Sequence, residues 1–90
     1  MPIPHKEKPQ LPVALRTLIG INVLRLRTQK GWTQEELAYE AGLHRTYISQ
    51  VEKSTRNVSI DTIECIVAAL EIDVRELFVA DEYQAAGHSI

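Results

Sequence analysis

The sequence predicts an all-α fold, a compact domain of five short helices, and three observations support this prediction. Apolar residues recur at intervals of three and four, which is the spacing of one face of a helix. The alternation of apolar and polar residues that indicates a strand is not sustained anywhere. All four prolines lie in the first twelve residues, so none interrupts the chain after Pro12.

The boundaries of the domain follow from the same distribution of prolines. Residues 1–12 combine prolines with charged side chains and can bury little, so we predict a flexible N-terminal arm there. Residues 13–80 form the predicted helical domain, and residues 81–90 form a C-terminal tail. A chain of 90 residues has room for one such domain.

The first helix is predicted over residues 13–30. Ile19, Val23 and Leu26 share one of its faces at helical spacing. Gly31 ends the helix, because glycine readily adopts the left-handed backbone that follows many helices.

The second helix is predicted over residues 33–41, and its start has a specific signature. Thr33 and Glu36 have the spacing of a capping box, in which each side chain binds the backbone N–H of the other residue. Gly42 ends this helix and permits the positive φ that a tight turn requires.

The third helix is predicted over residues 45–53, and it begins differently. Ile48 and Val51 point inward, but the cap position holds His44, which is a poor capping residue. Two interpretations remain open. Either this start is reserved for a contact outside the protein, or His44 is a tolerated surface residue.

Two more helices are predicted over residues 59–70 and 74–79. Ser59 caps the longer one, and Asp73 caps the shorter one with Glu76 as its capping-box partner. The inward face of the longer helix is predicted to hold Ile60, Ile63, Val67 and Leu70.

Composition excludes several classes of protein. The single cysteine, Cys65, rules out an internal disulfide and a four-cysteine metal site. No apolar run reaches the ~18–20 residues that a membrane span needs, and the N-terminus lacks the apolar core of a signal peptide. We therefore expect a cytoplasmic protein with no cofactor, metal ion or small-molecule ligand.

Charge is distributed unevenly along the chain. The net charge of −2 argues against a generic basic coat for nucleic acid. Residues 1–32 carry six basic side chains and one acidic, whereas residues 58–90 carry one basic and seven acidic. This asymmetry indicates two surfaces with different roles.

Residues 34–53 have the spacing of a helix-turn-helix. Ala38 is small enough to let the two helices approach each other, and Gly42 permits the turn between them. Ile48 and Val51 then hold the second helix of the unit against the first. In this unit the second helix enters the major groove of DNA.

The chain resembles the Cro/repressor-type helix-turn-helix family, also called Xre-like, over about residues 17–78. The resemblance is carried by GWTQEELA at residues 31–38, AGL at 41–43, YIS at 47–49, and shorter matches at 26–27, 51–52, 56–57 and 77–78. Within this family, RTYIS at residues 45–49 and RNVS at 56–59 are similar to the controller proteins of restriction–modification systems.

The resemblance implies a sequence-specific regulator of transcription that binds double-stranded DNA. Such a protein binds a palindromic or pseudopalindromic operator as a homodimer, with the third helix in the major groove. The residues expected to contact bases are His44, Arg45, Thr46, Ser49 and Gln50. The residues expected to contact phosphates are Gln34, Tyr47, Lys53, Arg56 and Asn57.

Two of these base contacts have specific chemistry. Arg45 can bind guanine O6 and N7 together, and Gln50 can pair with adenine N6 and N7. Phosphate contacts fix the register of the protein on the duplex without reading its sequence.

The resemblance also concerns residues that do not touch DNA. Arg27 and Glu52 match positions that form a structural ion pair between the first and third helices of the family. Ser54 and Glu71 stand where the family commonly has glycine with left-handed backbone geometry. Either these two residues are strained, or the loops around them follow different paths.

The C-terminal third has more apolar residues than its short last helix needs. The predicted dimer interface consists of Ile72, Val74, Leu77, Phe78 and Val79, with Tyr83 as a further contributor. The alternative is that these residues merely close the small core.

Competing functions differ in their main partner. We do not expect an enzyme, because the sequence has no catalytic triad, metal cluster or phosphate-binding loop. The alternative function is an antitoxin-like or other protein-binding module, whose main partner is another protein. RNA polymerase is a further partner if the domain activates transcription, and the sequence does not separate an activator from a repressor.

Overall fold

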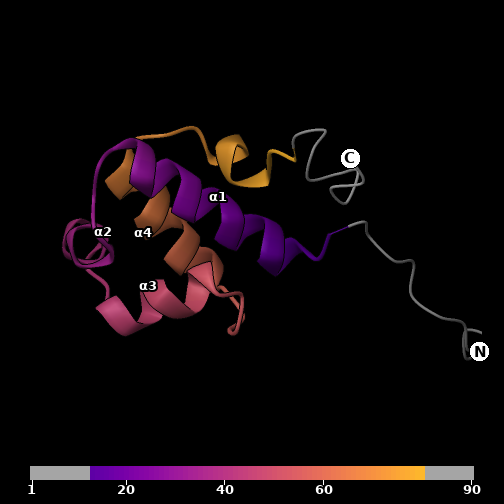
Figure 1. Ribbon diagram of the computed structural model, residues 1–90, viewed down its shortest axis with the longest axis horizontal. Coiled ribbons are helices and arrows are strands. Elements are labelled where there is room, and N and C mark those ends of the chain that lie inside the picture. Colours follow the sequence, from indigo (N-terminus) through magenta and orange to yellow (C-terminus); the bar gives the residue numbers. More distant parts are fainter. Residues whose placement is uncertain (1–12, 81–90) are drawn as a thin grey trace, which may run out of the picture.

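The structure, a computed structural model, describes residues 13–80 (Figure 1). Its elements follow in the order α1 (Leu15–Gln29), α2 (Gln34–Ala41), α3 (Arg45–Glu52), α4 (Ile60–Leu70) and the 3₁₀ helix η1 (Val74–Phe78). No strand occurs between residues 13 and 80. The fold is therefore all-helical, and the fifth predicted helix is a short 3₁₀ segment. The predicted arm, the predicted tail and Tyr83 lie outside the described residues.

The helix α1 crosses the domain, and α3, α4 and η1 pack against it. In Figure 1, η1 lies above α1 and α3 lies below it, and both pack against it. The helix α2 packs against α3 and α4. The C-terminal segment and the helix-turn-helix therefore lie on different sides of α1.

One apolar core joins all five elements. Trp32, Leu43, Tyr47 and Val58 pack at its edge. The fully buried apolar side chains are Val23, Leu37, Ile48, Val51, Ile66, Leu70 and Leu77. Because side chains from α1, α2, α3, α4 and η1 meet in one cluster, the outer face of α3 is held in a defined orientation.

The inward face of α4 differs from the prediction at its first residue. Ile60 is 74% exposed, whereas Ile66 and Leu70 are buried. Ile63 and Val67 pack against the edge of the core as predicted. The prediction for Ile60 is wrong because the buried stripe of this helix follows Thr62, Ile66 and Leu70. Ile60 lies six residues before Ile66, which places it roughly 120° around the helix from the centre of that stripe.

Polar caps begin α2 and α4. The Thr33 hydroxyl accepts a hydrogen bond from the Glu36 backbone N–H at 3.0 Å, and the Glu36 carboxylate accepts one from the Thr33 N–H at 2.7 Å. This confirms the predicted capping box. The Ser59 hydroxyl accepts from the Thr62 N–H at 3.1 Å, which confirms the predicted cap of α4.

The cap of η1 uses a different partner from the one predicted. The Asp73 carboxylate accepts from the Arg75 backbone N–H at 2.8 Å and from its guanidinium at 2.9 and 3.0 Å. The hydrogen bond from the Arg75 side chain lowers the pKa of Asp73 from 3.8 to about 2. The predicted partner, Glu76, instead pairs with Arg25 at 3.6 Å.

Two loop residues adopt the left-handed backbone that glycine prefers. Ser54, after α3, has a φ of 62°, and Glu71, after α4, has a φ of 57°. Of the two alternatives left open by the sequence, the structure therefore shows strained residues on the usual loop path.

Candidate nucleic-acid interface

The turn between α2 and α3 has the geometry of a helix-turn-helix. Gly42 adopts left-handed backbone, with a φ of 70°. Its N–H donates to the Tyr39 carbonyl at 3.2 Å, and the Leu43 N–H donates to the Ala38 carbonyl at 2.9 Å. These bonds satisfy the last carbonyls of α2 and direct the chain into α3.

His44 caps α3, contrary to what its residue type indicates. The backbone N–H of Thr46 donates to Nδ1 of the His44 imidazole at 3.1 Å. When Nδ1 accepts this bond, the ring hydrogen of the imidazole lies on Nε2. The start of α3 is therefore capped by a side chain, and the Nε2–H remains a donor on an exposed residue.

The predicted base contacts share the outer face of α3. Arg45 and Thr46 are exposed, and Ser49 and Gln50 are half-buried. The opposite face is buried in the core through Ile48 and Val51. Nothing among residues 13–80 forms a hydrogen bond or ion pair with the Arg45 side chain, so its guanidinium is available to a ligand. The structure thus brings these residues together with His44.

Arg56, in the loop after α3, contacts two residues of that helix. Its guanidinium donates from Nη1 to Oε1 of Gln50 at 2.9 Å. The same guanidinium stacks on Tyr47, with its central carbon 4.6 Å from the ring centroid. The structure therefore joins two predicted phosphate contacts and one predicted base contact in a single cluster.

A partly buried chain of hydroxyl groups anchors the Tyr47 ring. Ser59 donates to the Thr62 hydroxyl at 3.0 Å, and Thr62 donates to the Tyr47 hydroxyl oxygen at 3.1 Å. Thr62 is buried, and the sequence analysis did not identify its role. A phenolic hydroxyl both donates and accepts, so Tyr47 can bind an acceptor outside the protein while it accepts from Thr62.

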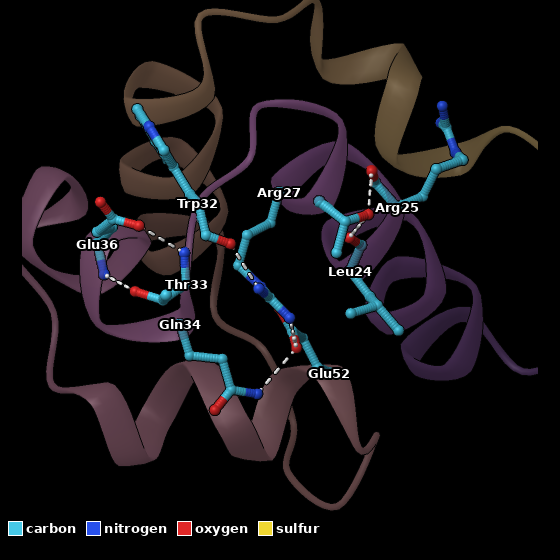
Figure 2. A network of polar contacts seen from close by, with 9 residues as sticks. Leu24, Arg25, Arg27, Trp32, Thr33, Gln34, Glu36 and Glu52 are labelled. Carbon is cyan, nitrogen blue, oxygen red and sulfur yellow. Dashed lines mark hydrogen bonds and ion pairs between the residues drawn. The ribbon is translucent and has the colours of Figure 1, made fainter.

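Arg27 and Glu52 form a largely buried ion pair (Figure 2). Nε and Nη2 of Arg27 donate to the two carboxylate oxygens of Glu52 at 2.6 and 3.0 Å. Nη1 of Arg27 also donates to the Trp32 carbonyl at 2.7 Å. The Gln34 side chain donates to the same carboxylate at 2.9 Å. The amide of Gln34, a predicted phosphate contact, is therefore bound to Glu52.

The loop after α3 presents the remaining predicted phosphate contacts. Lys53, Arg56 and Asn57 are all exposed. Ser54 bends this loop toward the start of α1, where its hydroxyl donates to the Arg16 carbonyl at 3.3 Å. This bond ties the loop to α1, and the hydrogen bond from Arg56 to Gln50 joins the loop to the outer face of α3.

The predicted dimer residues divide into two groups. Val74, Phe78 and Val79 are exposed large apolar side chains, and Ile72 is half-buried against the core. Leu77 is fully buried, so its assignment to the interface is wrong. It is part of the core and has no surface to offer a partner.

Asn22 holds the C-terminal segment on α1, and the sequence analysis missed it. Its side-chain amide donates to the carbonyls of Leu77 and Val79 at 2.8 and 2.9 Å, and its oxygen accepts from Arg25 at 3.1 Å. Asn22 is 1% exposed. The available signal was a polar residue between Ile19 and Leu26 on the apolar stripe of the first helix.

Metal-binding clusters and membrane-spanning helices are both absent from the described residues. Residues 13–80 contain no group of three His, Cys, Asp or Glu side chains placed to hold a metal ion. No helix in this range has the length and apolar character needed to cross a membrane.

Comparison with known proteins gives a consistent result. The family model described as Helix-turn-helix matches residues 23–77. The chain is 48% identical to the Control protein C.BamHI of Bacillus amyloliquefaciens over 64 residues. This match covers 70% of the chain and 79% of that relative.

Solved structures extend this similarity to the fold. The restriction-modification controller protein C.AhdI of Aeromonas hydrophila is 44% identical with a TM-score of 0.68, covering 70% of this chain and 96% of that one. The controller protein C.Esp1396I bound to a 25 base pair operator site is 38% identical with a TM-score of 0.67, covering 73% and 87%. A tetramer of C.Esp1396I in complex with its natural 35 base-pair operator has a TM-score of 0.65 at 33% identity, covering 74% and 99%.

Proposed function

This chain belongs to the helix-turn-helix family, and on that premise we propose that it is a sequence-specific regulator of transcription that binds double-stranded DNA. The observation that supports the proposal most strongly is that α3 has one buried apolar face and one accessible polar face. Ile48 and Val51 fix one face in the core, while the opposite face presents polar side chains led by Arg45, which has no side-chain partner among residues 13–80. A helix of this kind fits the major groove, where base edges are read.

Base contacts come from the outer face of α3. Arg45 binds guanine O6 and N7 with its planar fork of donors. Thr46 and Ser49 offer hydroxyl groups to base edges, and the Thr46 methyl group can contact thymine. His44 reaches the groove through Nε2–H, since its Nδ1 is bound to the backbone.

Phosphate contacts come from the loop after α3 and from the start of α2. Lys53, Arg56 and Asn57 lie on the exposed loop, and the Tyr47 hydroxyl can donate while it accepts from Thr62. Gln34 contributes its backbone N–H in the first turn of α2, where unpaired N–H groups favour an anion. These contacts set the register of α3 in the groove.

A homodimer supplies the specificity that one short helix lacks. Each good bidentate contact discriminates by only about 1–3 kcal/mol. A two-fold dimer doubles the contacts and reads half-sites about 34 Å apart. Val74, Phe78 and Val79 form the proposed interface, with Ile72 at its edge. The full chain is expected to sediment as a dimer at micromolar concentration, and a monomer there would contradict this assignment.

The relatives support a narrower placement within the family. We propose that the chain is a controller protein of a restriction–modification system. The support is the 48% identity with C.BamHI and the structural match to C.AhdI at a TM-score of 0.68.

In vitro selection from random duplex DNA tests the proposed function. The full chain is expected to enrich sequences with two inverted half-sites about one helical turn apart. The matched control is a variant with Arg45→Ala, which keeps the fold because this residue is exposed. Failure of the wild-type chain to enrich any sequence would contradict the proposal.

A further inference from the structure

The amide of Gln50 has a defined orientation. Its side chain contacts Nη1 of Arg56 at 2.9 Å. A guanidinium has only N–H donors and no acceptor, so the atom of the amide that faces it is the oxygen. The NH₂ group of Gln50 therefore points away from Arg56.

Arg56 is itself held in place. It stacks on the ring of Tyr47, with 4.6 Å between the guanidinium carbon and the ring centroid. The Tyr47 hydroxyl is fixed by Thr62, which is buried. The group that orients Gln50 thus rests on an aromatic ring that the core anchors, although Arg56 is exposed.

This orientation matters for base reading. A glutamine with a free amide matches adenine, since its oxygen accepts from N6 and its nitrogen donates to N7. With its oxygen turned toward Arg56, the amide directs its two N–H donors to the other side. Guanine presents two acceptors, O6 and N7, on its major-groove edge, whereas adenine places a donor at N6.

We propose that Arg56 is a positioning residue that makes Gln50 a hydrogen-bond donor, so that Gln50 selects guanine over adenine. This inference rests on the proposed DNA-binding function and adds a specificity to it. Arg56 keeps its other N–H groups for a phosphate, so both roles are compatible. The expectation from residue type alone, that Gln50 pairs with adenine, is replaced by one that depends on its neighbour.

The test begins by locating the base pair that Gln50 reads. Competition binding is measured between the selected operator and variants with each of the four base pairs at every position of the half-site. The position sought is the one at which Gln50→Ala removes the preference of the wild-type chain. At that position, the wild-type chain is expected to favour guanine over adenine by about tenfold, the scale of one bidentate contact.

The deciding variant is Arg56→Ala. Freeing the Gln50 amide is expected to abolish or reverse the guanine preference at that single position, beyond any general loss of affinity. Lys53→Ala is the matched control, because Lys53 is an exposed basic residue beside the same helix end. It is expected to weaken binding to all sequences equally and to leave the guanine preference intact.

Several results would overturn the inference. They are a wild-type preference for adenine at the Gln50 position, the absence of any position that depends on Gln50, and an unchanged base preference in Arg56→Ala. In each of these cases specific binding to the operator persists, so the proposed function stands. Loss of all sequence preference in the wild-type chain would instead contradict the function itself.

Discussion

Gly20 of α1 lies directly against the backbone carbonyl of Val51 in α3. A Cβ atom at position 20 would meet that oxygen at 2.5 Å and the Ser54 hydroxyl at 2.9 Å. Real Cβ atoms essentially never come so close to a backbone oxygen. The absence of a side chain at Gly20 is therefore what lets α1 approach the C-terminal end of α3.

Gly20→Ala is expected to lower the free energy of unfolding by about 1–3 kcal/mol, because backbone would have to move. The direction of this change in the free energy of unfolding is informative, because Gly→Ala inside an ordinary helix raises stability by roughly 0.5–1 kcal/mol. Urea unfolding followed by circular dichroism measures the difference. Gln29→Ala, on the exposed end of α1, is the control and should leave stability nearly unchanged. An equal or higher stability of the Gly20 variant would contradict the close contact.

Glu71→Gly is expected to stabilise the domain. A residue with a Cβ in left-handed backbone destabilises the fold by about 1–2 kcal/mol. Glycine removes this cost, but part of the gain is lost because glycine also makes the unfolded chain more flexible. We expect Tm to rise by a few degrees, since about 1 kcal/mol corresponds to roughly 4–8 °C in a domain of this size. Ala68→Gly, at an exposed right-handed position of α4, should lower Tm. A lower Tm for the Glu71 variant would show that its loop is not strained.

Breaking the pair of Arg27 and Glu52 from one side is expected to be costly. Their side chains are only 11% and 5% exposed, so Glu52→Gln leaves a nearly buried guanidinium without its counter-charge. The expected loss is about 3–5 kcal/mol of unfolding free energy. A double variant with methionine at both positions should lose much less stability than the sum of the losses in Arg27→Met and Glu52→Met. Additive losses would show that the pair is not coupled.

The pKa of Asp73 gives a prediction for acid solution. Its folded value of about 2 lies below the ordinary 3.8, so its contribution to stability is present above pH 3.8 and is lost as pH falls through about 2. NMR titration of the Asp73 carboxylate should show a midpoint near 2, and Arg75→Ala should return it toward 3.8. A wild-type midpoint near 3.8 would mean that the two side chains do not pair in solution.

Arg45→Ala is expected to relax sequence preference at one base position and to cost about 1–3 kcal/mol of binding there. Lys53→Ala should instead weaken binding to every sequence and reduce its salt dependence. Fluorescence anisotropy with operator variants at two or more salt concentrations separates these effects. If neither substitution changes binding to the selected operator, α3 does not lie in the groove as proposed.

Much of the fold could be predicted because it is encoded locally. The caps at Thr33 and Ser59 and the left-handed turn at Gly42 each depend on residue types within a few positions of one another. The resemblance to a known family added the left-handed backbone at Ser54 and Glu71, which spacing alone does not indicate.

Some features could not be predicted from the sequence. They either join distant parts of the chain or depend on the orientation of a single side chain. Asn22 binds Leu77 across 55 positions, and Gly20 meets Val51 across α1 and α3. His44 caps its helix through a ring nitrogen, which residue preferences do not anticipate. For the candidate site, helix spacing and the family resemblance placed Gln50 on the outer face of α3 but did not show the contact that orients its amide.

The carboxylate of Glu52 receives donors from α1 and α2 while it belongs to α3. One carboxylate therefore ties the three helices together, so α3 is held in place before the domain meets a ligand. The entropy lost on association then comes from the ordering of surface side chains and from the lost translation and rotation of the two molecules. Little of it comes from ordering of the backbone. Calorimetry should accordingly find a heat-capacity change close to that of two rigid surfaces meeting, without the larger change that marks folding coupled to binding.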